Sequence, residues 1–340
     1  MRVVIFGLLS LVLAAAEPPQ APPQAELSNG TLRVKLFPPD AKSGFYRATR
    51  FDWSGMIEGV EYGGHKFYGR WFQGTDPAVK DFEYRGADII AGPNTSATGP
   101  AEEFNTAGKG LGFDEAKVGG TFLKIGVGVL RRPDERDYDH FRLYEIVDPG
   151  KWANRIGRDS VESTQRVNDP ASGYGYEYRK TVRLVGKGAE MEITHTFRNT
   201  GKKPISSQVY NHNFLVIDGQ APGPDFTISV PFEIRSERPP DAALAGIRGK
   251  QIVYRKTLEG RDRVMTAMQG FGPGASDYDI QVVNTKTGAG VRVTADRPLV
   301  NLMLWSIRAV MSVEPFVEFS VKPGESYNWT LRYRYLKPGD

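Results

Sequence analysis

The sequence predicts an all-β protein, a large antiparallel β-sandwich, from two observations. Apolar and polar residues alternate in short runs, which is the period of a half-buried strand, and no long helical stripe is evident. Gly, Pro, Asn and Asp break these runs at intervals that suit a multi-stranded sandwich. The clearest runs are residues 31–37, 181–185, 190–197, 227–230 and 290–294.

The N-terminal residues predict export. Arg2 precedes an apolar run at residues 3–13 and then three alanines, which is the pattern of a cleaved secretory signal. The run is too short to span a bilayer comfortably, so we expect no membrane insertion of the mature protein. We therefore predict a signal peptide at residues 1–16, a Pro-rich tether at 17–25, a single domain at 26–340, and a periplasmic or secreted location.

The amino-acid composition limits the kinds of ligand and partner that we expect. The 340 residues carry 44 Lys and Arg against 40 Asp and Glu, and the two signs are interleaved, so no nucleic-acid footprint is present. The absence of cysteine excludes disulfides and thiolate metal sites. An acidic group could hold Ca²⁺ but lacks a recognisable ligand spacing, so we expect a solvated loop, no metal and no cofactor. Its members are Asp134, Glu135, Asp137 and Asp139.

His212 is the best placed of the four histidines to act as an acid or a base. It lies between Asn211 and Asn213 in a segment that is otherwise suited to a buried strand. A buried imidazole costs free energy unless it has partners or a role, and it titrates near neutral pH. We therefore treat His212 as a candidate catalytic residue. The alternative is a core histidine with satisfied hydrogen bonds.

The run that precedes this segment contains a second histidine. Residues 190–197, a turn at 199–204 and the strand that follows predict a strand-turn-strand unit, with His195 and His212 on adjacent strands. Thr194 and Thr196 flank His195, as is typical of an exposed strand face. We expect His195 to be half-exposed and to have no special role.

Glu314 is the candidate partner of His212. It follows a largely apolar run that begins at residue 302, and Pro315, which cannot donate to a ladder, predicts a strand end there. A carboxylate at the rim of an apolar sheet gains the raised proton affinity that a general base needs. Alone, Glu314 would be interpreted as a solvated edge residue. With His212 it forms a candidate acid/base couple.

The two regions carry a family resemblance. The stretch THTFRNTGKKPISSQVYNHNF, residues 194–214, resembles the aldose 1-epimerase (galactose mutarotase) superfamily, in which a strand-turn-strand leads into an Asn-His-aromatic motif. Glu314 with its neighbours, the turn at 322–326 and the strand at 329–335 are similar to that superfamily's Glu strand and PGE turn. Looser similarity at 51–55, 68–71 and 109–113 extends the resemblance over most of the chain.

The resemblance implies a galactose mutarotase-like supersandwich with a sugar-binding cleft on a concave face. In that superfamily the Glu accepts the proton of the anomeric hydroxyl while the His protonates the ring oxygen. Carried over, Glu314 would be the base and His212 the acid. The resemblance assigns Arg70 to hydroxyl binding, with a surface ion pair as the alternative, and Asn211 of the motif to the substrate side.

One departure concerns the superfamily's second histidine. Where that residue is expected, this chain has Pro-Ala-Glu-Glu-Phe at 100–104, so Glu102 or Glu103 takes its place. We assign Glu103 to substrate binding. The alternative is a purely structural ion pair with Arg47, Arg50 or Arg70.

Aromatic residues in the N-terminal third give a separate indication of sugar binding. Planar rings stack on the apolar faces of pyranoses, and Trp71 is our candidate, although core packing explains such rings as well. The group comprises Trp53, Tyr62, Phe67, Tyr68, Trp71 and Phe72.

Three functions are compatible with these features. We favour an exported enzyme of the aldose 1-epimerase type with a sugar or oligosaccharide ligand. The alternatives are a non-catalytic carbohydrate-binding protein and an accessory β-sandwich of the cell envelope.

Overall fold

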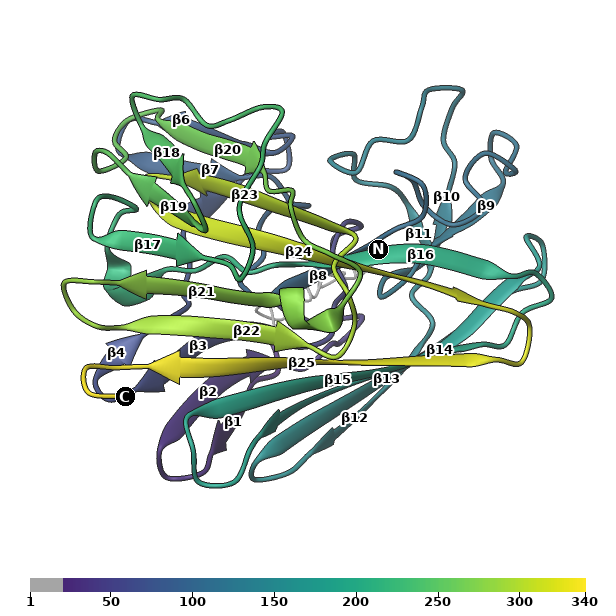
Figure 1. Ribbon diagram of the computed structural model, residues 1–340. Helices are drawn as coiled ribbons and strands as arrows, with labels where there is room; N and C mark the ends of the chain where they lie inside the picture. The colour runs from purple at the N-terminus through teal and green to yellow at the C-terminus, as the bar shows by residue number, and fades with distance from the viewer. Residues whose placement is uncertain (1–20) are drawn as a thin grey trace, which may run out of the picture.

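The computed structural model describes residues 21–340, so the predicted signal peptide and the first residues of the tether lie outside it. Two sheets dominate, and the predicted antiparallel β-sandwich is confirmed (Figure 1). The larger has ten strands, all antiparallel to their neighbours. In spatial order they are β12 (Lys151–Ile156), β13 (Ser160–Asp169), β14 (Tyr174–Leu184), β15 (Glu190–Asn199), β25 (Ser326–Leu336), β22 (Gly290–Ala295), β21 (Asp279–Asn284), β17 (Phe226–Ser229), β19 (Gln251–Tyr254) and β18 (Ala245–Arg248).

The second sheet has five antiparallel strands, and three small sheets and two 3₁₀ turns complete the described chain. The five strands are, in spatial order, β20 (Arg263–Ala267), β23 (Asn301–Ile307), β24 (Val310–Val321), β16 (Ile205–His212) and β8 (Ala101–Asn105). The small sheets are β1 (Ala25–Ser28), β2 (Leu32–Phe37), β3 (Met56–Tyr62) and β4 (His65–Lys66); β11 (Ile146–Asp148), β10 (Gly128–Arg131) and β9 (Thr121–Lys124); and β5 (Gly74–Thr75), β7 (Asp88–Ala91) and β6 (Phe82–Arg85). The turns are η1 (Ile217–Gly219) and η2 (Ala275–Asp277).

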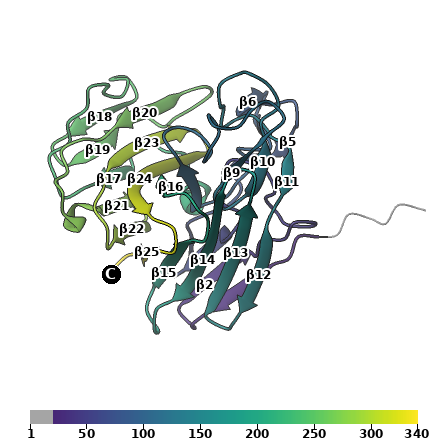
Figure 2. The ribbon, with the colours of Figure 1, turned by 90° about the vertical axis from the view of Figure 1, so that its right-hand side faces the viewer.

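The core lies where the inward faces of the strands meet. Alternation along β14 buries Tyr176, Tyr178 and Val182 and exposes Arg179 and Arg183, as a strand with one buried face requires. Figure 2 shows β12, β13, β14 and β15 side by side. A second apolar cluster gathers rings from the N-terminal half of the chain, and Phe214 joins it from the segment that follows β16. No helix among residues 21–340 is long and apolar enough to cross a membrane.

The predicted pairing of the strands that carry His195 and His212 is wrong. β15 pairs with β14 and β25 in the large sheet, whereas β16 pairs with β24 and β8 in the five-stranded sheet. The turn between them therefore crosses from one sheet to the other. Asn199 fixes this crossing, because its Nδ2 donates to the carbonyls of Lys203 at 2.8 Å and Val321 at 3.1 Å.

Pro315 does not end its strand, contrary to our expectation. β24 continues through it from Val310 to Val321 and pairs with β23 along the way. The missing N–H affects the edge that faces β16, because the ladder between β16 and β24 stops at the pair Tyr210–Phe316, next to Pro315. The proline thus marks the end of one ladder.

Candidate acid/base site

His212 and Glu314 come together on the outer face of the five-stranded sheet. Tyr210 is opposite Phe316 across the β16–β24 ladder, and two residues further on His212 faces Glu314. Nε2 of His212 lies 3.2 Å from Oε1 of Glu314. This is within the reach that proton transfer between side chains needs. The two side chains are 7% and 13% exposed, so the couple sits at the boundary of the protein interior.

Aromatic rings surround the imidazole of His212. Phe214 stacks on it with 3.6 Å between ring centroids, and the edges of Phe51 and Trp305 approach at 5.8 and 5.4 Å. Nδ1 is buried and has no partner among the described residues. Apolar surroundings of this kind destabilise the charged form of the imidazole.

Burial shifts both members of the couple toward their neutral forms. Desolvation raises the pKa of Glu314 to about 8, against the opposing influence of the Arg50 charge and of Ser312. Desolvation lowers the pKa of His212 well below its usual value, and Arg50 acts in the same direction. Near pH 7 the couple therefore consists of a protonated carboxyl and a neutral imidazole. Such oppositely directed shifts are a feature of acid/base sites.

Glu103 lies on the same face but is held by protein partners. Its Oε2 accepts from Arg50 Nε at 2.8 Å and from the Tyr210 hydroxyl at 2.6 Å, and its Oε1 accepts from Lys124 at 3.0 Å. Burial alone would raise its pKa, but the charges of Lys124 and Arg50 hold that pKa well below the usual range. Of the three arginines considered as ion-pair partners, the structure selects Arg50. Both carboxylate oxygens are occupied, which favours the structural alternative over ligand contact.

Glu102 faces the opposite way, into the space between the two large sheets. Its Oε1 lies 2.7 Å from His195 Nε2 and accepts from Asn211 Nδ2 at 3.1 Å. Its Oε2 accepts from the Tyr178 hydroxyl at 3.0 Å and lies 3.3 Å from Lys180 Nζ. Adjacent residues on β8 therefore serve two separate buried networks.

His195 is only 2% exposed, so the expectation of a half-exposed residue is wrong. Its ring stacks on Trp329 with centroids 4.3 Å apart while Nε2 meets Glu102. The flanking threonines point to the opposite face of β15, so they give no information about the surroundings of His195. The contacts of its two ring nitrogens with Glu102 and with the Trp329 carbonyl give His195 its hydrogen-bond partners, which sequence alternation alone could not show.

None of the remaining predicted binding residues offers a free polar group or an open ring face beside the couple, although Trp71 packs on Phe214 and Trp305, which contact His212. Asn211 is on the opposite face of β16 from His212, because neighbouring residues of a strand alternate. Trp71 is 1% exposed, and its Nε1 donates to the Ala97 carbonyl at 3.1 Å, so its ring has no open face for a ligand. Arg70 is exposed and lies over the Phe45 ring at 5.3 Å.

Sequence reasoning missed the central position of Arg50. Its guanidinium touches Glu103 and Tyr210, and its charge influences the pKa of both His212 and Glu314. It also missed Trp305, which alternation on β23 could have placed on the same face as Glu314. Arg50 lies in a segment without regular structure, so no periodic signal locates it.

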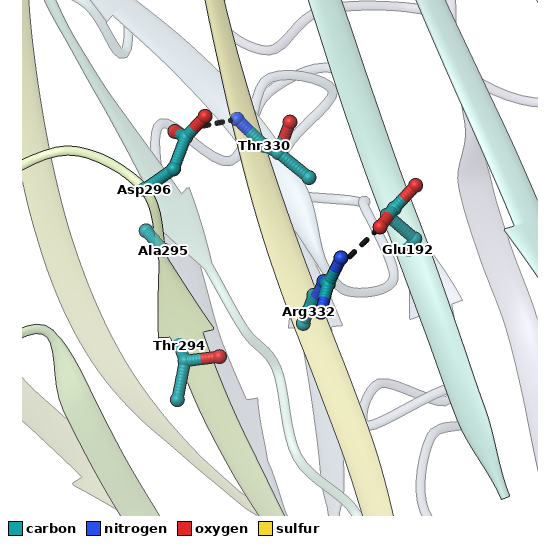
Figure 3. Close-up of a pocket in the computed structure, with 6 residues that line it drawn as sticks. All are labelled: Glu192, Thr294, Ala295, Asp296, Thr330 and Arg332. Carbon is teal, nitrogen blue, oxygen red and sulfur yellow. Dashed lines mark hydrogen bonds and ion pairs between the residues drawn. The ribbon is translucent and has the colours of Figure 1, made fainter. Parts of the chain in front are cut away.

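Two surface cavities are lined by residues other than His212 and Glu314. Figure 3 shows one of about 340 Å³ on the large sheet, where Arg332 Nε bonds Glu192 at 3.1 Å and Asp296 accepts from the Thr330 amide. A groove of about 700 Å³ lies at the other end of β16 and β24, near Gln208 and Glu318. Within residues 21–340, no group of three His, Cys, Asp or Glu side chains is arranged to hold a metal ion. Asp134, from the acidic group, instead binds Arg136 and Arg142.

Solved structures with the same architecture define the fold class. The chain is similar to the Slr1438 protein of Synechocystis sp. PCC 6803, at 13% identity and a TM-score of 0.54, over 96% of this chain and 100% of that one. It is also similar to a galactose mutarotase related enzyme of Lactobacillus acidophilus, at 12% identity and a TM-score of 0.52, over 92% and 97% of the two chains. A GalM/aldose epimerase homologue of C. elegans is similar at 14% identity and a TM-score of 0.52, over 93% of this chain and 99% of that one.

The protein therefore has the galactose mutarotase-like β-sandwich fold, as the sequence resemblance implied. No protein-family model and no curated protein matches the sequence. At these identities the likeness concerns the fold, and function has to be argued from the site.

Proposed function

We propose that this protein is carbohydrate-active and interconverts sugar anomers by proton transfer through His212 and Glu314. The observation that carries the proposal is the 3.2 Å contact between these two side chains, which are more than 100 positions apart in the sequence. The fold that holds them is shared with structures described as mutarotase-related and aldose epimerase-like.

The chemistry requires one proton to leave and one to arrive. The anomeric hydroxyl gives up its proton, the ring oxygen gains one, and the bond between the anomeric carbon and the ring oxygen breaks to give the open-chain aldehyde. Rotation about the adjacent C–C bond and the reverse transfers close the ring on either face. Each residue returns to its starting state over the full cycle.

The pKa directions support a specific division of labour near pH 7. Protonated Glu314 would donate to the ring oxygen, and neutral His212 would accept the anomeric proton. This reverses the roles that the superfamily resemblance assigns. The two assignments differ only in whether Glu314 or His212 carries the transferable proton at the start of the cycle.

The proposal includes export, which rests on the predicted signal at residues 1–16. Secretion of a full-length fusion, with processing near residue 16 read by mass spectrometry, tests it. Retention of an unprocessed chain would contradict it.

Polarimetry on freshly dissolved α-D-glucose and α-D-galactose tests the activity. We expect the purified protein to exceed the spontaneous rate and Glu314→Gln to abolish the excess. Glu318→Gln, an exposed glutamate on the same strand, is the matched control and should remain active. Equal rates with and without the wild-type protein on both sugars would contradict the proposal.

The second candidate is a carbohydrate-binding protein without turnover. The near-burial of the couple, which limits access of a sugar to His212 and Glu314, favours it over catalysis. It predicts a sugar affinity that survives Glu314→Gln and no acceleration by the wild type.

A further inference from the structure

A third histidine has an unused ring nitrogen beside the same residues. His140 lies in the segment between β10 and β11, and its Nε2 is buried without a partner among the described residues. A buried polar atom left unpaired costs free energy, so such an atom calls for a partner that the protein alone does not supply. The hydroxyl of nearby Tyr138 is unpartnered in the same way.

Arg50 connects His140 to the acid/base couple. The guanidinium carbon lies 4.5 Å from the centroid of the Phe51 ring and 5.0 Å from that of Phe141. The Phe51 ring contacts His212, and the Phe141 ring contacts His140 with centroids 4.1 Å apart. Each imidazole therefore contacts a phenylalanine ring that also contacts the guanidinium of Arg50.

The segment that carries His140 is fixed by hydrogen bonds. Asn94 Nδ2 donates to the His140 carbonyl at 3.2 Å, and the Asp139 amide donates to the Tyr144 hydroxyl at 2.9 Å. Lys80 binds the Asp139 carboxylate at 2.6 Å. The position of the imidazole is thus built into the fold rather than set by a loose loop.

We propose that His140 is a substrate-binding residue of the same site, whose Nε2 hydrogen-bonds a sugar hydroxyl while His212 and Glu314 act at the anomeric end. The proposal rests on the proposed carbohydrate function. Burial and the Arg50 charge lower the pKa of His140, so the ring is neutral near pH 7. A neutral imidazole offers one donor and one acceptor, which suits a hydroxyl group.

His140 reaches this region from the segment between β10 and β11, and the carboxylate of Glu103 binds the Arg50 guanidinium that packs on the Phe51 and Phe141 rings.

Nitrogen NMR of the full chain labelled at histidine tests the proposal, because there are only four imidazoles to assign. The labelled protein is titrated with D-galactose and D-glucose. We expect the ring nitrogens of His212 and His140 to shift together with one saturation curve. His65 and His195 should stay constant, since Asp218 and Glu102 hold them.

The outcomes separate the two proposals. A shift at His212 without one at His140 overturns the role of His140 and leaves the carbohydrate site intact. No shift at either residue with both sugars at saturating concentration contradicts the carbohydrate proposal and the His140 assignment together.

Substitution gives a second readout. His140→Gln should raise KM on the order of tenfold with a smaller change in kcat, because one hydrogen bond to the sugar is lost. His65→Gln is the matched control and should leave KM unchanged. An unchanged KM in a folded His140→Gln protein would overturn the assignment.

Discussion

Three glutamates of one sheet, two buried and one largely buried, differ in what surrounds them. Glu102 and Glu103 each meet cations and hydrogen-bond donors, and their pKa values fall well below the usual range despite burial. Glu314 meets the neutral ring of His212 and no direct cation, and its pKa rises to about 8. Burial alone therefore does not decide the charge of a carboxyl group. The glutamate without compensation is the one suited to exchange protons near neutral pH.

The largest effect on stability is expected when a cation that compensates a buried glutamate is removed. Lys180→Met leaves Asp52 and Glu102 buried beside each other without the lysine that lies 3.4 and 3.3 Å from them. We expect a loss of about 3–5 kcal/mol in the free energy of unfolding, measured by urea denaturation. Lys35→Met, at an exposed position, should cost little. Equal stabilities of the two variants would refute the view that Glu102 is held by its partners.

Glu314 should behave in the opposite way when its titratable carboxyl is replaced by an amide. Its folded pKa exceeds its unfolded value of 4.5, so the native state binds the extra proton between these two values. The free energy of unfolding therefore falls as the pH rises from 4.5 through 8, and this contribution is lost above pH 8. Glu314→Gln removes that fall, by an amount on the order of a few kcal/mol.

The difference between wild type and Glu314→Gln isolates this group from all others. Denaturation of both proteins at pH 5 and pH 9 should show the variant gaining relative stability at pH 9. Parallel stability profiles for the two proteins would mean that Glu314 is not perturbed.

The smallest effect is expected where an ion pair is exposed. Arg33 binds Glu26 at 2.8 Å on the surface, with about half of each side chain exposed, so solvent screens the pair. Arg33→Met should leave the urea midpoint almost unchanged. A loss comparable to that of Lys180→Met would show that burial is not what separates the two kinds of pair.

Period-two alternation and turn residues were sufficient to predict the fold class. They also selected His212 and Glu314, because a polar residue in an apolar strand is conspicuous. They could not give the crossing after Asn199, because a hairpin and a crossing between sheets share the same turn signals. They could not give the partner of His195 either, since Glu102 is 93 residues away and belongs to the other sheet.

The rest of the site depends on irregular segments. Arg50 and His140 reach the outer face from loops, where side-chain direction follows from tertiary packing. For Trp71, Asn211 and Glu103 the sequence marked chemically active residue types, but strand register and buried partners decide their surroundings.

The central claim is that Glu314 is a largely buried carboxyl without a compensating cation, so that it keeps its proton near neutral pH. Carboxyl ¹³C NMR of glutamate-labelled protein, with the signal of Glu314 assigned by its loss in Glu314→Gln, follows its titration directly. We predict a midpoint about 8. A midpoint near 4.5, as for an exposed glutamate, would contradict the claim.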